Sequence, residues 1–405
     1  MKITGIVSEY NPFHKGHEYQ LKKARELSGC DAVVCVMSGN FVQRGEPAII
    51  DKFRRAEAAV WGGADIVIEL PLPFSCQNAE MFAYGAIREL GKIPVHALSF
   101  GCENDNVDTL RRIAEAQLES IQYNNVLRDE IKKGISYPAA MTKALSSLMG
   151  NEFSDSVVSP NNVLAVEYIK SSMKQNVCLE FFPVKRIGKS HNDHELSGLF
   201  DSATAIRSGI LSGSAKHTLS VTSKSMESIN GFYSDYGSFN MLDNYMDIIN
   251  YRIMELEKEG LNDIFDVSEG LNNKIYQSLF MHRSSHELIM SLKSKRYTYS
   301  RLRRILLNIA LDITYEDIKK FMSTEQYKYI KVLAFNDTGR KVIKNAQSRG
   351  TAVICRYSDY KKFGISAEEL PSFKLTAKAT NLYYLPFENR EANLEYKKNA
   401  AYIAK

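Results

Sequence analysis

The sequence contains no long apolar run. Nothing in its 405 residues approaches the roughly 18 consecutive apolar residues of a membrane span. The N-terminal segment MKITGIVSEY holds only a few apolar residues before Ser8, so it lacks the apolar core of roughly 7 to 15 residues that a secretory signal requires. Both absences predict a cytoplasmic protein with no membrane partner.

Paired cysteines are also absent. The six cysteines are scattered, and no two of them form a CxxC pair. This spacing is typical of buried thiols in a reducing compartment rather than of disulfides or a zinc site. The cysteines are Cys30, Cys35, Cys76, Cys102, Cys178 and Cys355.

A strong net charge is missing as well. A formal charge of +5 is small for this length and does not by itself indicate nucleic acid. The positive charge is concentrated in KSKRYTYSRLRR at 293–304, which has six Lys or Arg residues and no acid. This stretch is typical either of a solvated helix face or of an RNA-binding segment, with cations on phosphates and rings on bases. The RNA-contact candidates are Lys293, Lys295, Arg296, Tyr297, Arg301, Arg303 and Arg304.

Short β-branched runs alternate with helix-like stretches over the first hundred residues. We predict strands at 3–7, 32–37, 65–70 and 96–101, and a further strand at 178–187. Strand and helix in alternation predict an α/β fold with a Rossmann-like, doubly wound parallel sheet.

Longer helical patterns dominate after about residue 225. We therefore expect two domains, an α/β domain at 1–220 and a mainly helical C-terminal domain at 221–405. Doubly wound sheets bind ligands outside the carboxyl ends of their strands. The loops that follow the predicted strands are therefore the candidate site.

The loop after the first predicted strand carries two histidines around a glycine, in the order His14, Lys15, Gly16 and His17. Backbone N–H groups and the dipole of the following helix attract anions to such a loop. Gly16 leaves room for a phosphate, and both imidazoles can donate hydrogen bonds to phosphoryl oxygens. On this tetrapeptide alone, idle turn histidines and a metal site stay open as alternatives, although a third metal ligand at the usual spacing is absent. We assign no metal ligand.

A second candidate phosphate site lies in SATAIRSG. Ser202, Thr204 and Arg207 stand in the first turns of a predicted helix capped by Asp201 or Ser202, where they could converge on a β- or γ-phosphate. Taken alone, the segment is typical of a capped helix with an exposed arginine.

Together, the histidine turn and the 202–207 helix start resemble the HxGH and Ser-Thr-Arg signatures of the nucleotidylyltransferase superfamily. A set of longer segments resembles, in order and spacing, the bacterial tRNA(Met) cytidine acetate ligase family. The resemblance is dense over about the first 210 residues and loose beyond them. The segments are GIVSEYNPFHKGHEYQL, VMSGNFVQRGEPAIIDKFRRAE, GADIVIELPLPFSCQNAEMFAYGAI, SFGCEN, GISYPAA, SPNNVLAVEYIK and SATAIR.

The resemblance implies a ligase that uses ATP to activate acetate as acetyl-adenylate and releases pyrophosphate. The acetyl group would then pass to N4 of the wobble cytidine of elongator tRNA(Met), giving N4-acetylcytidine. Mg²⁺ is expected with ATP on general grounds. The basic stretch in the C-terminal domain would contact the tRNA, whose wobble base stands in an accessible loop.

The resemblance also implies the ATP contacts. They come from one segment after the first strand and from Gly101, Asn162 and Arg186, with Asn161 competing for the role of Asn162. His14 and His17 would be the catalytic pair. Arg44 could hold a phosphate or the acetate carboxylate, or pair with Glu46 in its own loop. The segment is Val7, Ser8, Glu9, Tyr10, Asn11, Pro12, Phe13, His14, Lys15, Gly16, His17, Glu18, Tyr19 and Gln20.

Other functions stay open at this point. One is an adenylyltransferase acting on a small phosphorylated acceptor, which would leave the residues beyond 220 unexplained. Another is a non-catalytic RNA-binding protein with a vestigial nucleotide site. Acetyl-CoA is an alternative acetyl donor, but we see no CoA-binding P-loop in the sequence.

Overall fold

A mainly parallel sheet lies at the centre of the computed structural model, which describes residues 1–151, 153, 159–186, 201–213, 219–268, 270–323 and 329–404. Its main path runs in the order β10-β8-β5-β2-β1-β6-β7, with β9 paired to β8. A separate hairpin joins β3 to β4. The strands are β1 (Ile3–Ser8), β2 (Ala32–Ser38), β3 (Phe41–Val42), β4 (Glu46–Pro47), β5 (Ile66–Leu70), β6 (Ala97–Cys102), β7 (Glu180–Lys185), β8 (Tyr329–Phe335), β9 (Ala352–Ile354) and β10 (Ala401–Tyr402).

The five strands β1, β2, β5, β6 and β7 pair in parallel, so the predicted α/β fold is confirmed. Successive residues of β2 alternate between two apolar clusters: Val34 faces one, while Val33 and Cys35 face the other. A strand buried on both faces reads as a continuous β-branched run, which explains why the sequence pattern was easy to recognise.

Strand β8 comes from far along the chain and pairs antiparallel with β5, with Val332 opposite Ile68. Strands β9 and β10 pair in parallel with β8. The segment 221–405 therefore contributes strands to the central sheet in addition to its helices. The division into two domains at residue 220 stays a prediction.

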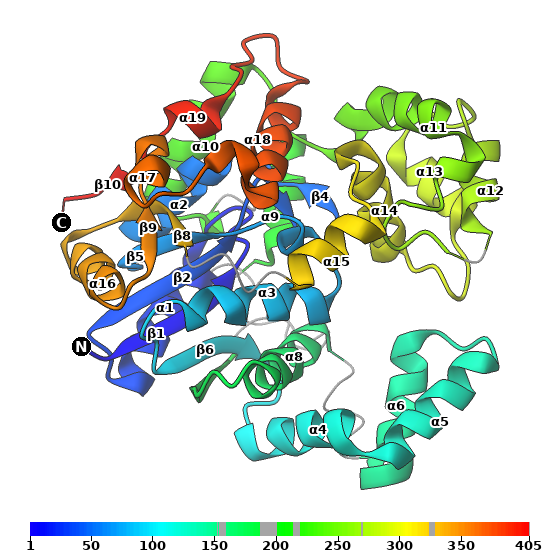
Figure 1. Cartoon of the computed structure of the whole chain (residues 1–405), viewed down its shortest axis with the longest axis horizontal. Coiled ribbons are helices and arrows are strands. Elements are labelled where there is room, and N and C mark those ends of the chain that lie inside the picture. Colours follow the sequence, from blue (N-terminus) through cyan, green and yellow to red (C-terminus); the bar gives the residue numbers. More distant parts are fainter. Residues whose placement is uncertain are drawn as a thin grey trace.

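Helices cover both faces of the sheet (Figure 1). Apolar residues of α1 and α2 pack on one face, and those of α3 and α8 on the other. Short 3-10 turns lie at Phe74–Cys76, Leu242–Tyr245 and Ala367–Glu369. The helices are α1 (Lys15–Ser28), α2 (Lys52–Trp61), α3 (Ala79–Gly91), α4 (Val107–Glu119), α5 (Ile121–Lys132), α6 (Tyr137–Met149), α8 (Pro160–Lys174), α9 (Ala203–Ser212), α10 (Ser223–Tyr236), α11 (Met246–Gly260), α12 (Leu271–Gln277), α13 (Ser285–Leu292), α14 (Tyr299–Leu311), α15 (Tyr315–Ser323), α16 (Asp337–Ser348), α17 (Tyr357–Lys362), α18 (Pro371–Tyr384) and α19 (Leu394–Lys397).

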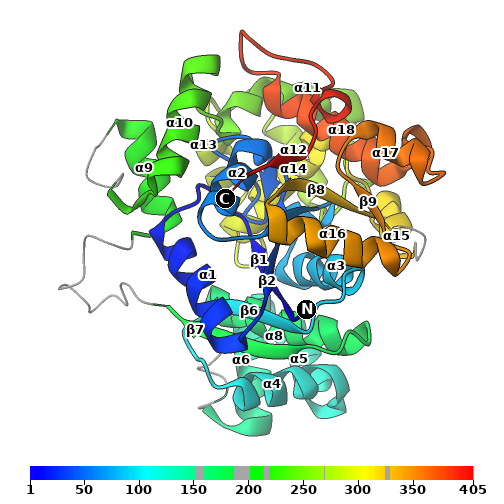
Figure 2. The ribbon, with the colours of Figure 1, turned by 90° about the vertical axis from the view of Figure 1, so that its left-hand side faces the viewer.

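Two groups of helices extend away from the sheet. Helices α11 to α14 form a lobe at the right of Figure 1, and α4 to α6 form a second group below it. Viewed from the side, α9 lies beside the end of α1 that follows β1 (Figure 2). Within the described ranges, no helix has both the length and the apolar character that crossing a membrane would need.

Candidate active site

Two loops meet where the order of the sheet reverses. From β1 the chain adds β2 and β5 on one side, whereas β6 and β7 lie on the other side. The carboxyl ends of β1 and β6 therefore flank the switch point at which doubly wound sheets bind their ligands. The histidine turn follows β1, Gly101 lies near the end of β6, and Arg186 directly follows β7. A Cβ atom on Gly101 would lie 3.7 Å from Cγ of Arg186, so these two residues are neighbours.

The two histidines cap the helix that they begin. Nδ1 of His14 accepts a hydrogen bond from the backbone N–H of Gly16 at 3.1 Å. Nδ1 of His17 accepts one from the backbone N–H of His14 at 3.3 Å. The arrangement is a reciprocal capping box, and the two rings stack with their centroids 3.7 Å apart.

These hydrogen bonds fix the tautomer of both rings. A backbone N–H can only donate to an unprotonated nitrogen, so each neutral ring carries its proton on Nε2. Burial and then the charge of Arg186 lower the pKa of His14 to about 4, against an opposing effect of Asp201. Burial, followed by His14 and Arg186, lowers the pKa of His17 well below 6.5. Near neutral pH the turn thus presents two uncharged Nε2–H donors beside a helix N-terminus.

The low pKa of His14 makes stability depend on pH. Between pH 6.5 and about 4, the unfolded chain takes up a proton at this position that the folded chain does not. We therefore expect the free energy of unfolding to fall, by on the order of 3 kcal/mol, as the pH drops through this window. Urea unfolding above pH 6.5 and near pH 4 measures the loss. The variant His14→Asn, which has no titrating group there, should lose less, and an equal loss in both proteins would contradict the assignment.

Buried aromatic rings hold the turn from beneath. The ring centroid of Tyr10 lies 5.0 Å from that of Phe13 and 4.8 Å from that of His17. The hydroxyl of Tyr10 lies 3.3 Å from Sγ of Cys35 on β2. Packing of this kind restricts the imidazole of His17 to one position before any ligand binds.

The remaining residues of the predicted ATP segment begin helix α1 or precede the turn. Lys15 is half-buried, and Glu18 is exposed on the first turn of α1. Glu9 accepts a hydrogen bond from the backbone N–H of Gln43 at 2.9 Å, and Asn11 accepts one from that of Ile49 at 2.8 Å. These two side chains join the histidine loop to the loop after β2.

Asn162 lies at the start of α8 and supports the loop after β6. Its side-chain oxygen accepts hydrogen bonds from the backbone N–H groups of Glu103 and Asn104 at 2.9 and 3.2 Å. Asn161 is less buried and donates to the carboxylate of Glu103 at 2.6 Å. Of the two asparagines, Asn162 is therefore the more buried and the one that holds the backbone of the loop after β6. Its contact with ATP stays a prediction.

Helix α9 brings the second candidate segment to the histidine loop. Ser202 is the N-cap of α9 and accepts from the backbone N–H of Ala205 at 3.2 Å. Arg207 donates to the backbone carbonyl of Asn11 at 2.9 Å and to the hydroxyl of Thr204 at 3.4 Å. Of the two caps considered from sequence, Ser202 is the one observed, and Arg207 is largely buried rather than exposed.

Arg44 lies on the same edge of the sheet and is exposed. The alternative partner considered for it, Glu46, instead contacts Arg207 and Arg303. The charge of Arg44 acts on both Arg207 and Arg303, so its side chain lies near a cluster that already holds two arginines.

Arg55 organises both loops, and the sequence pattern did not predict this role. This fully buried side chain on α2 donates to the backbone carbonyls of Glu9, Ser38, Gly39 and Ile50. In KFRRAEAAV, Arg55 occupies a position on the apolar face of α2. This position is the sequence feature that could have predicted its burial. One guanidinium thus fixes the chain where it leaves β1 and β2.

The basic stretch 293–304 divides into buried and exposed parts. Tyr297 is only 6% exposed, and its hydroxyl donates to the backbone carbonyl of Ser268. Arg301 pairs with Asp266 at 2.9 Å. The ring of Tyr297, which was predicted to stack on a base, is therefore buried inside the lobe, where its hydroxyl is hydrogen-bonded.

Three cations of the stretch, Lys293, Lys295 and Arg296, are exposed. The same lobe carries an exposed aromatic residue that the sequence pattern did not predict. Phe280 is 70% exposed with φ of +60°, a backbone conformation rarely held by such a residue. Neighbouring residues gave no charge pattern that would have drawn attention to it.

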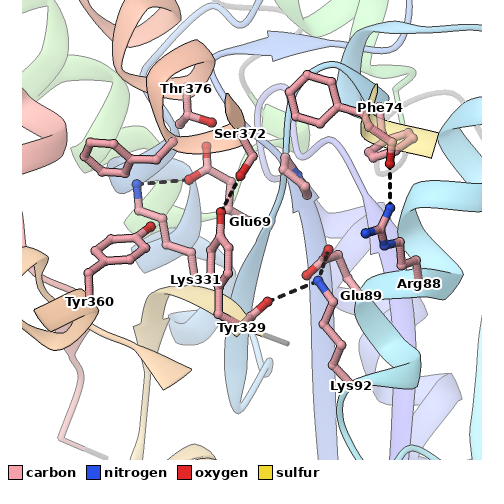
Figure 3. A pocket seen from close by; sticks show the side chains of 13 residues that line it. Glu69, Phe74, Arg88, Glu89, Lys92, Tyr329, Lys331, Tyr360, Ser372 and Thr376 are labelled. Atoms are coloured by element: carbon pink, nitrogen blue, oxygen red, sulfur yellow. Dashed lines mark hydrogen bonds and ion pairs between the residues drawn. The ribbon is translucent and has the colours of Figure 1, made fainter. Parts of the chain in front are cut away.

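A cavity of about 30 Å³ lies elsewhere, between β5, β8, α3 and α18 (Figure 3). The polar groups of this cavity contact one another. Nζ of Lys331 lies 3.2 Å from a carboxylate oxygen of Glu69. The hydroxyl of Tyr329 lies 2.6 Å from that of Ser372, and Nζ of Lys92 donates to the backbone carbonyl of Tyr329. Burial lowers the pKa of Lys331 to about 7. The residues around it are Glu69, Pro71, Phe74, Arg88, Glu89, Lys92, Phe321, Tyr329, Lys331, Tyr360, Ser372, Phe373 and Thr376.

The cavity borders a buried network of alternating charges. Lys52 contacts Glu69 at 2.6 Å and also Glu395, which in turn contacts Lys331. Residues from α2, β5, β8 and α19 thus meet at one point beneath the loop after β2. This network ties the later part of the chain to the loop that carries Arg44.

No three His, Cys, Asp or Glu side chains lie together so as to hold a metal ion in the parts of the chain that the structure describes. The groups that converge on the histidine turn are instead hydrogen-bond donors and arginines. Such a set suits phosphoryl oxygens rather than a resident metal.

Comparisons with known proteins point in the same direction. The HIGH Nucleotidyl Transferase family matches residues 1–398. A tRNA(Met) cytidine acetate ligase of Clostridium novyi is 37% identical over 409 residues, with 100% of each chain covered. One from Thermoanaerobacter is 39% identical over 400 residues, covering 96% of each. The crystal structure of Thermotoga maritima TmcAL bound with alpha-thio ATP aligns with a TM-score of 0.91 at 32% identity, covering 100% of both chains.

Proposed function

Since this chain belongs to the tRNA(Met) cytidine acetate ligase family of HIGH nucleotidyl transferases, we propose that it activates acetate with ATP and acetylates a cytidine of elongator tRNA(Met). The acetyl group goes to N4 of the wobble cytidine and yields N4-acetylcytidine. The observation that carries the proposal is the pair of neutral Nε2–H donors at a helix N-terminus, next to the topological switch point.

In the first step a carboxylate oxygen of acetate attacks the α-phosphorus of ATP, and pyrophosphate leaves. Negative charge on the phosphoryl oxygens rearranges in this step, so fixed donors aimed at those oxygens lower the barrier. His14 and His17 donate from Nε2, and Arg207 adds a guanidinium held by Asn11. Because both rings are neutral, they act as hydrogen-bond donors and not as general acids.

In the second step the N4 amine of cytosine attacks the carbonyl carbon of acetyl-adenylate. AMP leaves with the bonding electron pair, and the amine loses one proton. A wobble base suits this reaction because it stands in a loop, where a base can be reached without opening a duplex. The reaction takes place in the cytoplasm, where tRNA is available.

For the carboxylate of acetate we propose Arg44, which is exposed in the hairpin after β2, at the carboxyl end of that strand. A guanidinium binds a carboxylate through two parallel hydrogen bonds and so orients it. Mg²⁺ would arrive on the triphosphate, since phosphate oxygens are its preferred ligands. Within the described residues no carboxylate cage competes for that role.

Acetate-dependent exchange of labelled pyrophosphate into ATP tests the first step without tRNA. Mass spectrometry of tRNA(Met) after incubation with ATP and labelled acetate tests the second. We expect exchange that requires acetate and label in N4-acetylcytidine. Exchange that ignores acetate would support an adenylyltransferase with another acceptor. Tight tRNA binding with neither reaction would support an RNA-binding protein, and labelling only from acetyl-CoA would overturn the donor.

For the tRNA surface we propose the exposed cations Lys293, Lys295 and Arg296. Replacing all three by glutamine should raise the KM for tRNA by about tenfold or more and flatten its salt dependence, because phosphate contacts release counterions. Acetate-dependent pyrophosphate exchange should stay at the wild-type rate.

The matched control replaces Lys341, Lys344 and Arg349 by glutamine. These residues belong to α16 and its C-terminal end, on the side of the sheet away from the α11 to α14 lobe (Figure 1). This variant has the same change in net charge, so an equal loss of tRNA affinity in it would show a general charge effect.

A further inference from the structure

The N-terminal part of α14 packs directly on the loop that carries Arg44. Gly45 in this loop has φ of +77°, and a Cβ atom there would lie 2.5 Å from the backbone nitrogen of Arg304 and 2.7 Å from the carbonyl carbon of Arg303. Backbone meets backbone at this point, so only glycine fits. The helix that ends the basic stretch is thereby fixed against the nucleotide-binding loops.

Glu46, the next residue, bridges two arginines from distant parts of the chain. One carboxylate oxygen lies 2.8 Å from Nη2 of Arg207 on α9, and the other contacts Nη2 of Arg303 on α14. The side chains of Glu46, Arg207 and Arg303 are 14%, 15% and 21% exposed. Such shielding from solvent limits screening by salt, so the interaction persists under physiological conditions.

Arg207 extends this connection to the histidine turn. Its other terminal nitrogen, Nη1, donates to the backbone carbonyl of Asn11 at 2.9 Å. His14 stands three residues further along the same loop. A continuous path of polar contacts thus runs from α14 through Glu46 and Arg207 to the candidate ATP site.

The cluster carries more positive than negative charge. Arg44, Arg207 and Arg303 face Glu46 and Glu9, so one positive charge lacks a counterpart among them. Burial lowers the pKa of Arg303 to about 10, and the charge of Arg44 acts in the same direction. An anionic ligand relieves this excess, and an arriving phosphate is such a ligand.

We propose that Arg303 is a positioning residue of the nucleotide site, and that Glu46 couples helix α14, which follows the proposed tRNA-binding cations, to Arg207. The inference rests on the proposed function and deepens it by assigning Arg303 to ATP as well as to the RNA side. Through this bridge, Glu46 holds Arg207 and Arg303 together beside the histidine turn.

The test measures the affinity for ATP alone, by calorimetry on the full chain without acetate or tRNA. We expect Arg303→Gln and Glu46→Gln each to weaken ATP binding by about tenfold, the usual cost of losing a charged contact that orients a binding group. In Glu46→Gln the loss of this orientation should outweigh the positive charge that the substitution adds. Since both residues act through one carboxylate, the double variant should be little weaker than either single variant. A second readout is the KM for ATP in pyrophosphate exchange, which should rise more than kcat falls.

The matched control is Arg252→Gln. Arg252 forms an ion pair of 2.5 Å with Asp312, the residue that caps the other end of α14, and is 19% exposed. Arg252 itself lies on α11, so the substitution removes an ion pair with the C-terminal end of α14, together with one to Glu255, without touching Glu46. Its affinity for ATP should equal that of the wild type.

Two results would overturn the inference. Arg303→Gln with unchanged ATP affinity and a raised KM for tRNA would make Arg303 an RNA contact only. Equal losses in Arg303→Gln and Arg252→Gln would show a displaced helix rather than a specific bridge. Failure of the proposed function is distinguishable, because there the wild type binds ATP yet lacks acetate-dependent exchange.

Discussion

Replacing His14 by asparagine is expected to lower the rate of acetate-dependent pyrophosphate exchange by about 10² to 10³-fold without unfolding the protein. Asparagine is among the best N-cap residues, so its side-chain oxygen can replace Nδ1 in accepting from Gly16. While this oxygen caps the helix, the amide NH2 of asparagine is too short to reach the position of the Nε2–H donor, which points away from the cap. His17→Gln, which suits the third position of a capping box, should show a loss of similar size.

His14→Ala is the comparison that separates capping from catalysis. It removes both the cap and the donor, so it should be as inactive as His14→Asn and less stable by about 1 kcal/mol. Thermal unfolding and pyrophosphate exchange are measured on both variants. Activity that survives in His14→Asn but disappears in His14→Ala would mean that His14 acts only as a helix cap, and the proposed role in phosphate binding would fail.

The second large effect concerns stability. Arg55→Met should lower the free energy of unfolding by about 3 to 5 kcal/mol, because the backbone carbonyls of Glu9, Ser38, Gly39 and Ile50 would lose a buried donor. Urea unfolding in the absence of ATP measures the change. Activity should fall as well, since these carbonyls belong to the two loops that carry the candidate site.

Arg349→Met is the control for this substitution. Arg349 is exposed at the end of α16, where its side chain bonds only with Asn345 at 3.3 Å among the described contacts. Its loss should change the free energy of unfolding by less than about 0.5 kcal/mol. A similarly small change in Arg55→Met would show that water or a rearranged loop replaces the guanidinium.

The sheet and the histidine turn were accessible from sequence because their signals are local. A strand such as β2 is a continuous apolar run, and the turn places two histidines and a glycine between a strand and a helix. Periodicity and adjacency are enough to detect such features. The ATP contacts inferred by resemblance, Gly101 and Arg186 among them, stay predictions on positions that the fold places beside the turn.

What the sequence did not reveal depends on partners far along the chain. Tyr297 looked like a stacking ring, but its hydroxyl finds Ser268 inside the lobe. From sequence, Arg55 resembles any other helix arginine, and only the fold shows that it donates to four backbone carbonyls. The partners of Glu46 are also distant in sequence, since Arg207 and Arg303 lie on separate helices. A charged residue shows its role only when its burial and its partner are both known.

Strand β8 has a consequence for the order in which the protein matures on the ribosome. Until residues 329–335 have been synthesised, the edge of β5 stays open in the nascent chain, and open strand edges invite aggregation. The ion pairs that Lys52 forms with Glu395, and Glu69 with Lys331, also cannot form before those later residues are synthesised. The loops of the candidate site therefore reach their final form well after the residues that compose them leave the exit tunnel. During that interval the β5 edge is open to pairing with other chains.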